Sequence, residues 1–172
     1  MHDWKESIAR IVHWKQVTND NDTLGAFPWH LPRVAANSAR IAEAETHMGV
    51  PFSPAYREFL SLADGWVGFC VTTDLFGTED FLSGRAHEVL RRPDVAGYLS
   101  ESGLPARYVV PLGASDVDMD VFLLVSEAAK QCSGQVMWIA GSEVERYSDF
   151  ADFFEAMVNY NARLAQQLAD QR

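Results

Sequence analysis

The sequence contains little cysteine and no long apolar run. Its 172 residues include two cysteines, Cys70 and Cys132, which are far apart and flanked by apolar or small residues. A disulfide is conceivable, but two buried thiols in a reducing compartment are favoured. The N-terminal segment is amphipathic, lacks a signal-peptide pattern, and no run approaches the roughly 20 apolar residues that cross a bilayer. We therefore expect a cytoplasmic protein without membrane association.

Motifs of catalysis and cofactor binding are also missing. The five histidines have neither the HExxH pattern nor any other paired-ligand spacing, and neither cysteine has a nearby histidine in the sequence. No serine lies in a G-x-S-x-G elbow, and the glycines form neither G-x-G-x-x-G nor a phosphate-binding loop. The sequence therefore predicts a protein that is not an enzyme and has no catalytic residues, metal or cofactor.

One motif resembles a calcium-binding loop but is incomplete. Asp116, Asp118, Asp120 and Glu127 have the carboxylate spacing of an EF-hand loop. The sixth loop position, which makes a sharp turn and requires glycine, is Val121 here, and the flanking segments are typical of strands, not helices. The favoured interpretation is an acidic hairpin tip without a bound metal.

Basic residues are scarce in the middle of the chain. The formal net charge is −10, and residues 64–127 hold 11 acidic and only 4 basic residues. A field of this sign repels nucleic acid and anionic membranes and attracts basic proteins. Acidic loops can also serve solubility alone. Composition therefore leaves both interpretations open.

The apolar residues that are present suffice for a single packed domain over residues 1–172, since 48% of the chain is hydrophobic. Periodicity and capping residues predict helices near 3–17, 33–48, 54–64, 84–92 and 149–169. Aromatic and β-branched runs predict strands near 66–72, 108–112, 121–125 and 135–140. Ser148 is expected to cap the last helix, and Phe59 and Phe153 are expected in the core. This order indicates an α+β fold, with a partly antiparallel central sheet packed by N-terminal helices and a long C-terminal helix.

Residues 41–66 carry the most specific local signals. Ser53 is a good N-cap, and Pro54 suits the first position of the helix that follows. Gly65 is predicted to end that helix with a positive φ angle. None of these residues is a nucleophile or a metal ligand, so the segment specifies a shape.

This segment resembles the SUKH superfamily, which includes the fungal Smi/Knr cell-wall regulators and many bacterial proteins. The matching residues are Ile41, Glu45, Gly49, Tyr56, Phe59, Leu60, Asp64, Gly65 and Trp66. Phe52–Ser53–Pro54 stands where the family usually has Leu-Pro. Further on, 108–113 resembles the central hairpin of the family, and 146–154 resembles its closing aromatic segment. The resemblance covers about residues 36–158 and leaves 1–35 as an N-terminal helical extension.

The resemblance implies an α+β domain without an enzymatic role. Many bacterial members are thought to be immunity proteins that neutralise polymorphic toxins, often nucleases, and basic nuclease sites suit an acidic inhibitor. We therefore expect a protein partner, a basic toxin domain, with an intracellular adaptor or regulatory scaffold as the alternative. A small-ligand sensor or an enzyme is less favoured. The expected partner-binding residues are Trp66, Asp74, Glu79, Asp80, Asp116, Asp118 and Asp120.

Overall fold

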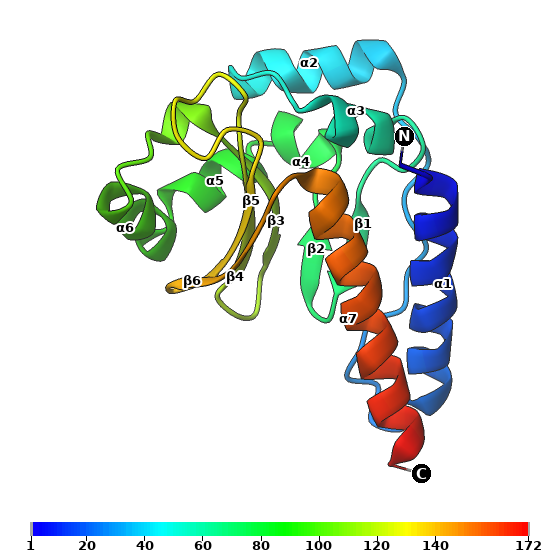
Figure 1. The fold of residues 1–172 in the computed structure, drawn as a ribbon. Helices are drawn as coiled ribbons and strands as arrows, with labels where there is room; N and C mark the ends of the chain where they lie inside the picture. Colours follow the sequence, from blue (N-terminus) through cyan, green and yellow to red (C-terminus); the bar gives the residue numbers. More distant parts are fainter. Residues whose placement is uncertain (1, 172) are drawn as a thin grey trace.

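The computed structural model describes residues 2–171, which form seven α-helices, a short 3-10 helix and six strands (Figure 1). The helices are α1 (Trp4–Asn21), α2 (Ser38–Met48), α3 (Pro54–Leu60), α4 (Thr78–Leu82), α5 (Arg85–Arg91), α6 (Pro93–Glu101) and α7 (Phe150–Asp170). The strands are β1 (Trp66–Cys70), β2 (Thr73–Leu75), β3 (Val109–Ser115), β4 (Asp120–Val125), β5 (Val136–Ala140) and β6 (Glu143–Tyr147), and η1 (Ala106–Tyr108) precedes β3. This arrangement confirms the predicted α+β class.

The six strands form one sheet in the order β1 to β6, and every neighbouring pair is antiparallel. The sheet is thus more regular than the partly antiparallel one that was predicted. Both cysteine thiols are free, although Cys132 is only half-buried. No helix within residues 2–171 combines the length and the apolar character needed to cross a bilayer.

The sheet curves around α7, and Phe153 shows this most directly. Its fully buried ring lies 6.3 Å from that of Phe69 in β1, 4.9 Å from Phe122 in β4 and 5.5 Å from Tyr147 in β6. Three separated strands can reach one side chain only if the sheet bends towards the helix. Phe59 of α3 is also fully buried, as predicted.

Helices α5 and α6 lie on the opposite face of the sheet (Figure 1). The hydroxyl of Tyr98 in α6 lies 3.1 Å from the sulfur of Met137 and donates to Glu143 at 2.5 Å. The next residue of β5, Trp138, faces the other way and packs against Tyr160 of α7. This alternation is what a strand with both faces covered requires.

Helix α1 packs along α7 and extends the core beyond the sheet, and the two helices run in the same direction (Figure 1). The Trp4 ring lies 5.4 Å from both Phe150 and Phe154, and Arg10 pairs with Glu155 at 2.9 Å. The buried ammonium group of Lys15 donates to the carbonyl of Gly68 in β1. The predicted N-terminal extension is therefore integrated into the fold.

Several predicted boundaries differ from the structure. Helix α2 begins at Ser38 because Asn37 caps it, while residues 33–36 run extended and bond to residues 60–65. Asp149, not Ser148, caps α7, since its carboxylate accepts the amide of Asp152 at 2.8 Å. Strand β6 was not predicted, because four of its five residues are exposed and polar residues predominate.

A close backbone contact joins the chain after α3 to the start of α4. Gly65 has a φ angle of +84°, as predicted, although α3 itself ends earlier, at Leu60. A Cβ atom on Gly65 would lie 2.5 Å from the amide nitrogen of Gly77. This approach lets the Asp64 carboxylate accept both the amide and the hydroxyl of Thr78, each at 2.6 Å. Glycine is required because no side chain fits between the two segments.

Candidate partner-binding end of the sheet

Three hairpin turns meet at one end of the sheet. Thr73 of β2 pairs with Ser115 of β3, and Asp120 of β4 pairs with Ala140 of β5. These registers place together the turns at residues 71–72, 116–119 and 141–142. The two acidic clusters of the sequence, around 74–80 and 116–120, therefore approach each other in space.

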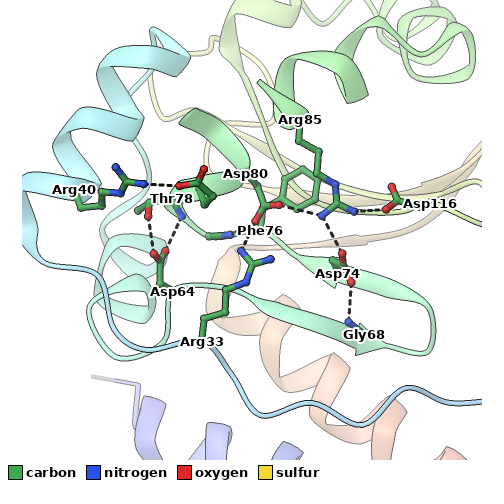
Figure 2. A network of polar contacts seen from close by, with 12 residues as sticks. Arg33, Arg40, Asp64, Gly68, Asp74, Phe76, Thr78, Asp80, Arg85 and Asp116 are labelled. Carbon is green, nitrogen blue, oxygen red and sulfur yellow. Dashed lines mark hydrogen bonds and ion pairs between the residues drawn. The ribbon is translucent and has the colours of Figure 1, made fainter. Parts of the chain in front are cut away.

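Arg85, the first residue of α5, joins these two clusters (Figure 2). One guanidinium nitrogen lies 2.9 Å from Asp74 of β2 and 3.0 Å from Asp80 of α4. The other terminal nitrogen lies 2.9 Å from Asp116 in the β3–β4 loop. The guanidinium also lies 4.8 Å from the ring centroid of Phe76, an arrangement that adds a cation–π attraction. One side chain thus binds three segments of the chain: β2 with the residue that follows it, α4 and the β3–β4 loop.

Asp80 is the most buried carboxylate of this network, with 7% of its side chain exposed. Besides Arg85, it accepts a hydrogen bond from Arg33 at 2.8 Å and from the amide of Gly77 at 2.9 Å (Figure 2). A carboxylate removed from water needs such partners, because burying an unpaired charge is costly. Asp80 therefore serves the fold more than it serves an external surface.

Two expected binding residues lie elsewhere. Trp66 was expected at the rim of the acidic region, but it is fully buried and its indole N–H donates to the carbonyl of His30 at 2.7 Å. Its ring lies 5.9 Å from that of Phe69, and the segment that precedes α2 accepts its N–H, so it offers no surface to a partner. Glu79 is exposed but points to α2, where it pairs with Arg40 at 2.5 Å.

The β3–β4 loop is held by its own polar side chains. The Ser115 hydroxyl accepts the amides of Val117 and Asp118, both at 3.2 Å. The Asp118 carboxylate accepts the amide of Asp120 at 2.9 Å and the hydroxyl of Thr72 at 2.6 Å. These bonds fix the loop against the β1–β2 turn and give it one shape.

The pKa values of Asp118 and Asp120, at the end of the loop, are shifted in opposite directions. Burial raises the pKa of Asp120, as does the neighbouring Asp118, although the indole N–H of Trp138 donates to it at 2.6 Å. Burial also opposes ionisation of Asp118, but the hydrogen bonds from Thr72 and the Asp120 amide outweigh it and keep its pKa below the usual range. Asp118 is therefore firmly ionised at neutral pH and exposed at the loop.

The acidic field is weaker than the sequence suggests. The six expected carboxylates are accompanied by Arg33, Arg40 and Arg85, so their formal charge falls from −6 to −3. Asp118 and Asp120 have no cationic partner among residues 2–171. The negative potential is accordingly concentrated on the β3–β4 loop.

These arginines were missed because they are distant in sequence from the acids they bind. The sequence position of Arg85 gave one weak indication that it has a tertiary partner. Arg85 opens helix α5, where the positive end of the helix dipole disfavours a cation, so its position requires a compensating tertiary partner. Arg33 was predicted to begin a helix, whereas the structure has it extended and bonded to residues 64–65.

A hollow of about 360 Å³ lies between α5 and the β3–β4 loop. It is lined by Arg85, Glu88, Val89, Arg92, Ala114, Ser115, Asp116 and Asp118. Arg92 is paired with Asp94 at 2.7 Å, and Arg85 is occupied as described above. Within residues 2–171 no group of three or more His, Cys, Asp or Glu side chains is placed to hold a metal ion. Both arginines of the lining are therefore already paired with carboxylates.

The structure defines an α+β domain whose curved antiparallel sheet wraps a long final helix and presents a charged end. The family model described as SMI1/KNR4 family (SUKH-1) matches residues 35–156, and the chain belongs to this family. Domains of this family are generally non-catalytic and point to protein–protein interaction. No curated protein matches the chain. Helix α1 and the last turns of α7 lie outside the matched region.

Proposed function

We propose that this chain is a cytoplasmic immunity-type protein that neutralises a basic toxin domain, such as a nuclease, by binding it at the three-turn end of the sheet. The observation that carries the proposal is the convergence of the two acidic clusters there, with Asp116 and Asp118 exposed on a fixed loop. Family membership supports a protein-binding role, and the charge indicates the kind of partner.

Electrostatic steering explains why this location suits an inhibitor. A basic partner is drawn towards the unneutralised carboxylates of the β3–β4 loop, which speeds association. The fixed loop geometry means that little ordering is needed on binding. Asp74 and Asp80 contribute indirectly, because they hold Arg85, which in turn holds Asp116.

If the chain is an immunity protein, the adjacent gene is expected to encode a protein that ends in a variable toxin domain. The experiment is stopped-flow binding of the purified chain to the product of this neighbouring gene at two ionic strengths. The triple variant Asp116→Asn, Asp118→Asn, Asp120→Asn should associate much more slowly than the wild type at low salt, and the difference should shrink at high salt, where screening removes steering. Dissociation should change less.

A matched control removes the same charge elsewhere. The variant Glu101→Gln, Glu127→Gln, Asp170→Asn also loses three exposed carboxylates, none of them on the β3–β4 loop. Its association rate should stay close to that of the wild type. If both triple variants slow association equally, net charge and not this end of the sheet governs encounter, and the proposed binding face is wrong.

A further inference from the structure

The β3–β4 loop exposes apolar side chains between its acidic ones. Its sequence from Asp116 to Asp120 alternates acidic and aliphatic residues, a pattern that ordinarily turns the aliphatic side chains inwards. Here Val117 is 77% exposed and Met119 is 49% exposed, beside Asp116 and Asp118, which are also exposed although they bind the protein. Val117 is thus largely in solvent, and Met119 is about half covered.

All three carboxylates of the loop are bound to the fold. Asp116 reaches Arg85, Asp118 reaches Thr72, and Asp120 reaches Trp138. The turn at 116–119 is held by these bonds and by the Ser115 hydroxyl, and none of them involves the side chain of Val117 or Met119.

The loop that presents these side chains is fixed from two further directions. Arg92 of α5–α6 lies 3.3 Å from the carbonyl of Met119 and 3.5 Å from that of Ser115. The Met119 methyl group lies close to Gly141 in the β5–β6 turn, where a Cβ atom would be 3.1 Å away. Because the backbone that carries the two side chains is already fixed, a partner does not have to order this loop when it binds.

We infer that Val117 and Met119 are the apolar anchor of the partner interface. The occupant of this surface is a protein with a shallow apolar pocket that receives both side chains, rimmed by Arg or Lys residues that face Asp116 and Asp118. Charge complementarity with the exposed carboxylates on either side of Val117 selects this occupant. The inference rests on the proposed function and adds the chemistry of the contact.

The test replaces the anchor with polar side chains of similar size. The variant Val117→Thr, Met119→Gln is compared with Leu31→Gln, Val34→Thr, which makes the same kinds of change at residues that are 56% and 91% exposed near the β1 edge of the sheet. Circular-dichroism melting should show that both variants keep the wild-type thermal stability. Binding to the product of the neighbouring gene is then measured by stopped-flow and surface plasmon resonance.

We expect the anchor variant to dissociate about 10- to 100-fold faster than the wild type, with an association rate changed by less than about threefold. The control variant should match the wild type in both rates. The anchor variant is thus expected to change mainly the dissociation rate, whereas the triple Asn variant is expected to change mainly the association rate.

The outcomes separate the two proposals. If the wild type binds and the triple Asn variant associates slowly, but the anchor variant dissociates no faster than the control, the anchor is refuted and the proposed function stands. If the neighbouring product does not bind the wild type at all, the proposed function fails and the anchor fails with it.

Discussion

Replacing Arg85 by methionine tests whether this side chain holds the network together. Methionine keeps an unbranched apolar chain against Phe76 but removes every hydrogen bond to Asp74, Asp80 and Asp116. The matched change is Arg40→Met, which breaks ion pairs to Glu43 and Glu79. The two variants lose the same charge but differ in how far their partners are buried.

The burial of the partners sets the expected magnitude. The side chains of Asp74 and Asp80 are 16% and 7% exposed, so Arg85→Met leaves two largely dehydrated carboxylates with fewer partners. Breaking such a pair costs about 3–5 kcal/mol. Asp80 keeps Arg33, and Asp74 keeps the amide of Gly68 at 2.8 Å, so we expect the lower limit, about 3 kcal/mol.

The control should behave like a surface ion pair. Glu43 and Glu79 are 61% and 66% exposed, and such pairs contribute at most about 1 kcal/mol. Urea unfolding followed by tryptophan fluorescence at pH 7 measures both free energies of unfolding. Equal losses for Arg85→Met and Arg40→Met would show that the Arg85 network does not stabilise the fold.

Two further substitutions test the backbone contact and the buried cation. Gly65→Ala should lower the free energy of unfolding by about 2–4 kcal/mol, because the new Cβ atom is strained at positive φ and also clashes with Gly77. Gly49 also has a positive φ but nothing within 4 Å of such a Cβ atom, so Gly49→Ala should cost only about 1 kcal/mol. Similar losses for the two variants in urea unfolding would argue against the clash. For Lys15, burial lowers the pKa from 10.5 to about 8, so between these values the unfolded chain binds more protons and wild-type stability rises with pH. Lys15→Met should therefore stabilise the protein by about 2 kcal/mol at pH 7, where the buried ammonium carries its full penalty, and by much less at pH 10. An advantage in urea unfolding that does not fall between these two pH values would contradict this explanation.

The elements that could be predicted are those with local causes. Helix α3 begins where Ser53 caps it and Pro54 opens it, and α7 carries an apolar stripe that continues over its length. These signals depend on neighbours three or four residues away, so they survive in a single sequence. The positive φ angle of Gly65 was likewise predictable from the Asp–Gly pair.

The binding end could be predicted only in part, because its order comes from contacts distant in sequence. The acidic clusters were visible, but Arg85 lies 31 residues from Asp116, and no local pattern connects them. The burial of Trp66 was not predicted, because its indole N–H bonds to His30, which lies 36 residues before it in the sequence. Val117 and Met119 were missed because an alternating acidic and aliphatic pattern ordinarily turns the aliphatic side chains inwards.

In the β3–β4 loop, the residues that fix the backbone are not the residues whose apolar side chains face the solvent. Ser115, Thr72 and the Asp118 carboxylate determine the path of the backbone, whereas the side chains of Val117 and Met119 take no part in those bonds. Substitutions at the two outward positions should therefore alter folding stability by no more than about 0.5 kcal/mol. A lineage carrying this loop can change which surface it fits while the scaffold stays constant, so recognition can diverge quickly within an unchanged fold.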